Sequence, residues 1–166
     1  MKNQIFAFLF IFFLLSSLQL KAQSEFKRNS IFGELGGSAG LISINFDKRL
    51  SKSPEGFGIR VGAGYMAWQD TEIFNFPILV NYLAGNNGKY FEMGIGPTIG
   101  YAQERQEPMD PDLSFEPYMT VYGSINIGYR YQPLNGGFNF RAGISPILNF
   151  DDVIPFWPYL SFGYSF

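Results

Sequence analysis

The chain has 166 residues, of which twelve are basic, fourteen are acidic and none is histidine or cysteine. Without cysteine there is no disulfide, thiolate chemistry or cysteine-ligated metal, and without histidine the commonest general base is missing. Charged residues make up 16% of the sequence, against about 25% in ordinary soluble domains. The composition therefore indicates that something other than water covers much of the surface.

The first 22 residues have the three regions of a secretory signal peptide. Lys2 provides the basic start, residues 5–15 form an apolar run, and Ala22 is the small residue before the expected cut. The run is too short to span a bilayer, which takes about 20 apolar residues. We therefore expect a cleaved leader at 1–22 and one domain at 23–166. Loss of Lys2 and Lys21 leaves ten basic residues against fourteen acidic ones, a net charge of −4, so nucleic acid is not an expected partner.

Beyond residue 30 the sequence alternates between apolar and polar residues, and no window has a sustained helical period. The clearest strand is Tyr90–Tyr101, where apolar side chains on one face oppose Glu92, glycine and Thr98 on the other. The same pattern predicts strands at Phe57–Tyr65, Tyr118–Tyr131 and Phe138–Leu148. Weaker alternation predicts four more, at Ile31–Gly37, Leu41–Leu50, Ile73–Leu83 and Trp157–Phe166.

The fold class predicted from these segments is all-β: an antiparallel up-and-down transmembrane β-barrel of about eight strands. Residues 36–40, Gly-Gly-Ser-Ala-Gly, would form either a tight turn or a bend within one long strand, and an even strand count favours the turn. Closure removes the sheet edges, so we expect a monomer.

The content of the two faces indicates which one points outward. A soluble lipocalin-like barrel has the same period, but its polar face would carry many lysines and glutamates. Here that face is mostly glycine, serine, asparagine and threonine with single charges, which suits a narrow lumen. Tyrosine and tryptophan gather towards strand ends, as at membrane interfaces. The faces therefore favour a membrane barrel over a soluble one.

The lengths of the connections predict an orientation. Residues 84–88 and 132–136 are short and rich in asparagine and glycine, which is typical of periplasmic hairpins. The longest connection, 103–117, then lies outside the cell. The outer connections are acidic, and oxygen-rich clusters can hold Ca²⁺. However, Asp110-Pro111-Asp112 lacks calcium-loop spacing, so a solvated loop is the favoured interpretation and no metal or cofactor is expected.

Several segments resemble the small outer-membrane β-barrel proteins of Gram-negative bacteria, above all the uncharacterised porin-like barrels of the Bacteroidota. The resemblance rests on the leader ending at residues 21–23, on residues 34–37, 43–49 and 128–133, and on the ending Gly-Tyr-Ser-Phe at 163–166. It implies location in the cell outer membrane, with lipid and lipopolysaccharide as partners. It also implies that Tyr164 and Phe166 form the signal read by the barrel-assembly machinery.

The inward positions of the predicted strands carry seven charged side chains. Since eight strands leave an interior that side chains just fill, and buried charges must pair, we expect an ion-pair network that closes the lumen. Its members are Glu34, Asp47, Arg49, Arg60, Glu92, Arg130 and Arg141. The function expected is structural or surface interaction, with a narrow channel or carrier for small solutes as the alternative. An enzyme is not expected, because a serine hydrolase of the kind found in some small barrels needs a histidine base.

Overall fold

The structure, a computed structural model, describes residues 26–68, 71–104, 117–149 and 152–166. The proposed leader at 1–22 lies outside these residues. Within them the chain is all β, and no helix is long and apolar enough to cross a membrane. The strands are β1 (Asn29–Gly36), β2 (Ile42–Arg49), β3 (Gly56–Trp68), β4 (Thr71–Asn86), β5 (Lys89–Glu104), β6 (Tyr118–Tyr131), β7 (Gly137–Ile144), β8 (Ile147–Leu148), β9 (Val153–Ile154) and β10 (Pro158–Ser165).

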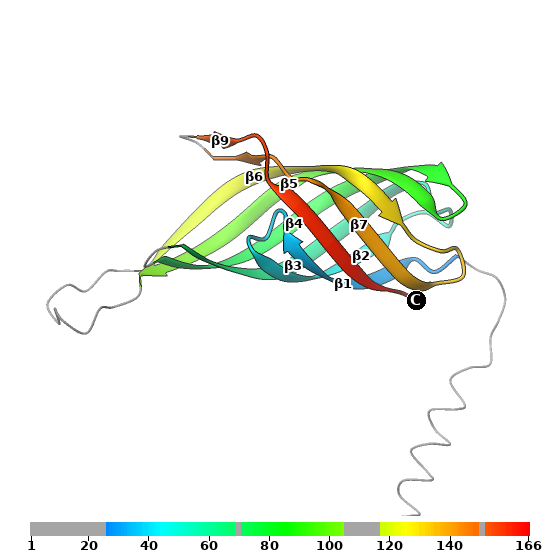
Figure 1. Cartoon of the computed structure of the whole chain (residues 1–166), viewed down its shortest axis with the longest axis horizontal. Coiled ribbons are helices and arrows are strands. Elements are labelled where there is room, and N and C mark those ends of the chain that lie inside the picture. Colours follow the sequence, from blue (N-terminus) through cyan, green and yellow to red (C-terminus); the bar gives the residue numbers. More distant parts are fainter. Residues whose placement is uncertain (1–25, 69–70, 105–116, 150–151) are drawn as a thin grey trace, which may run out of the picture.

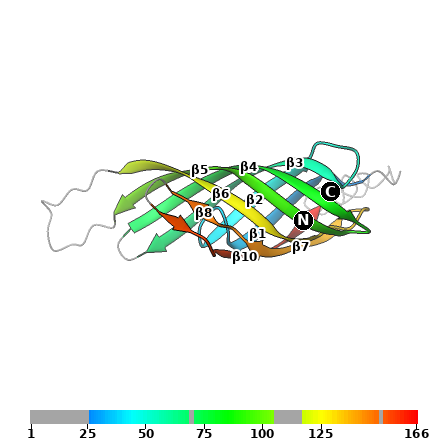
Figure 2. The same cartoon turned by 90° about the horizontal axis from the view of Figure 1, so that it is seen from above.

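The strands form a closed antiparallel barrel, as predicted (Figures 1 and 2). Consecutive strands pair from β1 to β6, β7 pairs with both β6 and β10, and β1 pairs with β10 to complete the ring. Because Ser30 faces Ser165, the first and last strands meet where β1 begins and β10 ends. We call this the terminal end of the barrel and the opposite one the far end.

Strands β7 and β8 together are the predicted strand 138–148. Ile127 of β6 faces Ile144, and Ser124 faces Ile147, so the pairing register is the same on both sides of the interruption. The interruption falls at Pro146, which has no N–H to donate to the ladder, although its carbonyl accepts from the Ile125 N–H at 3.0 Å.

Strands β9 and β10 similarly form one eighth strand, which begins earlier than predicted. Ile154 faces Ile147 and Pro158 faces Ile144, so four steps along this strand match three along its neighbour. The extra residue marks a β-bulge. The bulge breaks the alternation of apolar and polar residues, which is why the sequence placed the start of this strand at Trp157. The described residues therefore build eight strands in ten segments.

The segment 36–40 forms a turn, which settles the alternative left open by the sequence. Gly36, Gly37 and Gly40 have φ values of 72°, 81° and 103°, a region that glycine enters without steric cost. The Gly36 N–H donates to the Leu41 carbonyl at 2.9 Å. At the terminal end, Asn87 and Gly88 have φ values of 51° and 80°, as a two-residue hairpin turn requires, so the tight turn predicted there is confirmed.

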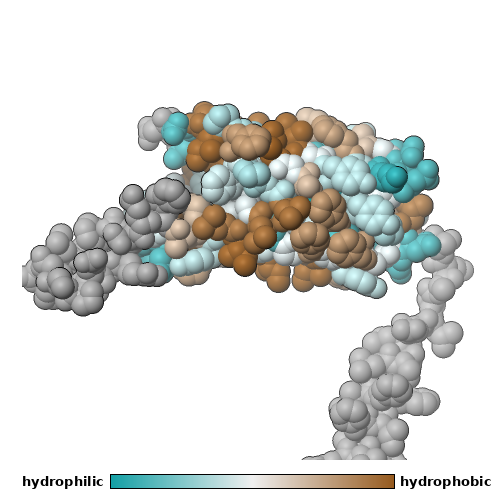
Figure 3. Space-filling view, in the orientation of Figure 1, coloured by the Kyte–Doolittle hydropathy of each residue, from teal (hydrophilic) through white to brown (hydrophobic). Residues whose placement is uncertain are grey.

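The outer face of the wall is apolar, as the alternation in the sequence predicts. Outward side chains are apolar and exposed over the length of the barrel, as at Leu35, Ile44 and Ile95. In Figure 3 hydrophobic side chains cover much of the visible wall, and hydrophilic ones lie towards its ends. The lumen differs from the expectation in one respect: it also buries the apolar or aromatic side chains of Phe32, Leu79, Leu83, Tyr90 and Tyr159.

Candidate functional site

The lumen is the candidate functional site because it contains every buried charge among the described residues. The seven charged side chains named from the sequence are each at most 4% exposed. They come from six strands: Glu34 from β1, Asp47 and Arg49 from β2, Arg60 from β3, Glu92 from β5, Arg130 from β6 and Arg141 from β7. Only closure of the barrel brings residues so far apart in sequence into one space.

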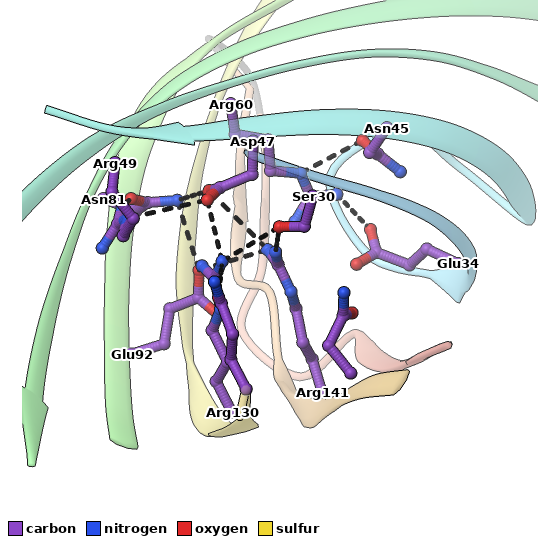
Figure 4. A network of polar contacts seen from close by, with 12 residues as sticks. Ser30, Glu34, Asn45, Asp47, Arg49, Arg60, Asn81, Glu92, Arg130 and Arg141 are labelled. Carbon is purple, nitrogen blue, oxygen red and sulfur yellow. Dashed lines mark hydrogen bonds and ion pairs between the residues drawn. The ribbon is translucent and has the colours of Figure 1, made fainter. Parts of the chain in front are cut away.

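Asp47 occupies the centre of the network (Figure 4). Its Oδ1 lies 2.8 Å from Nη2 of Arg130 and 3.6 Å from Nε of Arg49, and its Oδ2 lies 3.8 Å from Nη1 of Arg141. The contact with Arg130 is a charge-assisted hydrogen bond, which is stronger than a neutral one, and the other two contacts are ion pairs. Asp47 therefore holds together three arginines from three strands.

Glu92 pairs with two of the same arginines from the β5 side of the lumen. Its Oε1 lies 3.2 Å from Nη1 of Arg130 and 3.4 Å from Nη1 of Arg141. The hydroxyl of Ser30 accepts from both arginines at 3.2 Å. Arg130 and Arg141 are thus enclosed by acceptors on several sides, which is what buried guanidinium groups require.

Asn81 connects the parts of this cluster and is not among the residues predicted from the sequence. Its amide nitrogen donates to Asp47 and to Oε1 of Glu92, the latter at 3.2 Å, and its amide oxygen accepts from Arg49. The predicted strand 73–83 has apolar residues on both faces, which hid its inward side. Gln132 was also missed, because it was assigned to a turn, and it accepts from Arg130.

Glu34 and Arg60 form a second ion pair towards the far end. Arg60 Nε also donates to the side-chain oxygen of Asn45 at 3.1 Å. The ring of Phe32 lies between this pair and the central cluster, with its centroid 5.1 Å from the guanidinium carbon of Arg60 and 3.7 Å from that of Arg141. Such cation–π contacts stabilise guanidinium groups that are removed from water, so Phe32 joins the two clusters.

Inward glycines leave room for these long side chains. A β-carbon at Gly58 would overlap the guanidinium of Arg49, and one at Gly62 would overlap the side-chain oxygen of Asn45. Glycine within strands commonly marks a close approach of this kind. Glycine therefore stands on one strand where a long polar side chain of the neighbouring strand needs the space.

The charges of the described lumen do not balance. Four arginines face three carboxylates, which leaves one net positive charge. The Nε atoms of Arg49, Arg130 and Arg141 have no hydrogen-bond partner among the described residues, although other nitrogens of each guanidinium are hydrogen-bonded. All seven charged side chains are nevertheless buried, as the narrow interior of an eight-stranded barrel permits.

A second obstruction lies nearer the far end, where the β1–β2 turn folds into the lumen. Ser38 and Ala39 have no solvent exposure. The Ser38 carbonyl accepts from the hydroxyl of Thr98 on β5 at 3.1 Å and from that of Tyr122 on β6 at 3.2 Å. Since β5 and β6 lie across the barrel from β1 and β2, the turn reaches across the interior.

The acidic outer connections fall mostly outside the described residues, which include neither Asp110 nor Asp112. Where the chain is described, Glu72 accepts from the amide of Gln103 at 3.4 Å. No group of three or more metal-ligating side chains is found there.

No protein-family model matches the sequence, and no curated protein matches it. Among solved structures, the N-terminal β-barrel domain of Pseudomonas aeruginosa OprF is similar, with a TM-score of 0.61 over 84% of this chain and 96% of that chain. The two sequences are 11% identical. The chain is therefore similar in fold to that barrel domain: a closed, antiparallel, all-β barrel.

Proposed function

We propose that this protein is an integral outer-membrane β-barrel with a structural or surface-interaction role and a lumen closed by its own side chains. One observation supports the proposal above others: the barrel encloses seven charged residues and leaves large apolar side chains outside. Ile44 and Ile95 are 59% and 61% exposed. In water such a surface would be an aggregation hazard, whereas lipid covers it favourably.

The closed lumen favours the structural role over a channel or carrier. A solute passing along the axis would meet the Asp47 cluster and then the inward β1–β2 turn. Displacing a buried ion pair exposes charges that have lost their partners, which costs several kcal/mol, on the order of 3–5. This cost, together with the turn that Thr98 and Tyr122 hold inside the lumen, argues against free passage.

The partners and localisation are part of the same proposal. The apolar wall would contact lipid and lipopolysaccharide, with the far end outside the cell. Tyr164 and Phe166 are exposed on the outer wall at the end of the eighth strand, where the barrel-assembly machinery could reach them. The resemblance to small Gram-negative outer-membrane barrels, including those of the Bacteroidota, supports this placement. With no histidine or cysteine in the chain, we propose no catalytic role.

Fractionation and planar-bilayer recording test the proposal. The full chain, expressed in a Gram-negative host, is expected in the outer-membrane fraction and to need detergent for extraction. The purified barrel, inserted in a planar bilayer, is expected to show no steady ohmic conductance. Steady conductance would establish the channel alternative, and release into buffer without detergent would establish a soluble barrel.

A further inference from the structure

The far end of the lumen holds a cavity of about 530 Å³. Its floor is formed by Gly40 of the inward turn and by Asn75, and its walls include Met66, Ile73, Ala102 and Trp157. Small-molecule sites usually have volumes of about 300–1,000 Å³, with apolar walls and a few polar groups. The cavity has this size and composition, and none of its lining residues belongs to the ion-pair network.

Asn75 is the polar group at the floor. Its side chain is 1% exposed, and neither its amide nitrogen nor its amide oxygen has a hydrogen-bond partner among the described residues. The amide lies between two glycines: a β-carbon at Gly40 would be 3.1 Å from Nδ2, and one at Gly100 would be 3.1 Å from Oδ1. The two glycines therefore approach the amide closely without pairing with it. Since an unpaired buried polar group is costly, a molecule in the cavity that offers a donor and an acceptor to this amide would be stabilised there.

The remaining lining indicates the charge of that molecule. Among the described residues no lysine or arginine lines the cavity, and the one acid that does, Asp152, is exposed. A carboxylate ligand would thus be desolvated without a cation to pair with, and a cation would find no buried anion. Trp157 adds a second unpaired donor, because its Nε1 is buried and has no hydrogen-bond partner in the described part of the chain. The lining suits a neutral ligand.

We propose that this cavity binds a small neutral molecule with an apolar body and a carboxamide-type head. The head would donate to Oδ1 and accept from Nδ2 of Asn75, and the body would lie against Met66, Ile73 and Ala102. This binding function goes beyond a structural role, and it requires only that the barrel is folded.

Tryptophan fluorescence of the detergent-solubilised full barrel tests the proposal. The chain has two tryptophans, so Trp68→Phe leaves Trp157, in the cavity wall, as the reporter. Hexanamide is expected to change its emission saturably. Hexanoate and hexylammonium have the same chain length and are expected to bind at least about tenfold more weakly. Hexanoate has no donor for Oδ1 of Asn75, hexylammonium has no acceptor for Nδ2, and each carries a charge that would be unpaired.

Three variants in the Trp68→Phe background locate the site. Asn75→Leu is expected to weaken hexanamide binding by about tenfold or more, since it removes both hydrogen bonds. Ala102→Phe fills the cavity from its wall and leaves Asn75 in the sequence, and is expected to abolish the saturable signal. Asn139→Leu is the matched control, because Asn139 is a buried amide near the terminal end, facing Gly163, and its loss is expected to leave binding unchanged.

Circular dichroism checks that each variant is folded. If Asn75→Leu does not fold, Ala102→Phe still decides between binding in the cavity and partition into the micelle. The proposal is overturned by a non-saturable response in the Trp68→Phe protein, by equal affinity for hexanoate, or by an Ala102→Phe protein that binds as before. Equal weakening in Asn75→Leu and Asn139→Leu would also overturn it.

Discussion

Asp47 contacts more arginines than any other carboxylate in the described lumen. It pairs with Arg49, Arg130 and Arg141, whereas Glu92 pairs with two arginines and Glu34 with one. Because the lumen already has one more cation than anion, loss of this carboxylate would leave a net charge of +2 in a space closed to water.

Asp47→Asn is therefore expected to lower the free energy of unfolding by about 3–5 kcal/mol, the usual cost of removing one partner of a buried ion pair. Urea unfolding of the purified barrel in lipid vesicles, followed by tryptophan fluorescence, measures the change. Adding Arg49→Met returns the net charge to +1 and is expected to recover part of the loss.

Lys48→Gln is the control for this prediction, because it removes an exposed charge from the neighbouring position of the same strand. Its expected effect is within about 0.5 kcal/mol. If Asp47→Asn destabilised the barrel no more than Lys48→Gln, the network would not hold the lumen together.

At the scale of elements, the β1–β2 turn has a role that its length does not suggest. Five residues at 36–40 reverse the chain and also occupy the lumen, where Thr98 and Tyr122 hold the Ser38 carbonyl. Two hydroxyls on the opposite side of the barrel thus keep the turn inside.

Thr98→Val combined with Tyr122→Phe removes both donors and leaves the buried Ser38 carbonyl without them. An unsatisfied buried group costs about 1–3 kcal/mol, which lowers the free energy of opening the turn. Amide exchange at residues 36–41 is therefore expected to be at least about fivefold faster. Hydrogen–deuterium exchange with mass spectrometry measures it. Tyr101→Phe, an exposed hydroxyl on β5, is the control, and equal exchange in both proteins would show that the hydroxyls do not hold the turn.

At the scale of the whole molecule, closure depends on the pairing of β1 with β10. The exposed aromatic side chains of Tyr164 on β10 and of Phe166, the residue after it, make none of the backbone hydrogen bonds of this pairing. Stability of the closed barrel and recognition during its assembly can therefore be separated by experiment.

The Tyr164→Ala/Phe166→Ala variant is expected to refold in detergent like the unmodified protein, because its ladder is intact. In cells, less of it is expected to reach the closed form, since the proposed assembly signal is lost. The readout is gel mobility without boiling, because a closed barrel resists SDS. Leu160→Pro, which removes a ladder N–H within β10, should fail in both settings, and normal assembly of the double variant in cells would contradict the signal.

The alternation of residues along the chain determines most of the fold. In Tyr90–Tyr101 or Phe138–Leu148 it sets which side chains share a face, because successive residues of a strand point to opposite sides. That local property predicted the strands and placed the seven charged residues inward. It failed where local rules break: at the bulge between β9 and β10, at Pro146, and in β4, where apolar residues on both faces concealed Asn75 and Asn81.

Only the tertiary structure decided which inward groups meet. Closure and strand register bring Asp47 to Arg130 across the lumen, fold Ser38 towards Thr98, and place Asn75 against the far-end cavity. Contacts of this kind depend on barrel diameter, side-chain length and the space left by glycines, and none of these is a property of one strand. The sequence by itself thus determined the faces of the wall and the charges behind it, and the three-dimensional closure decided how those charges pair and where the far end of the barrel keeps a cavity.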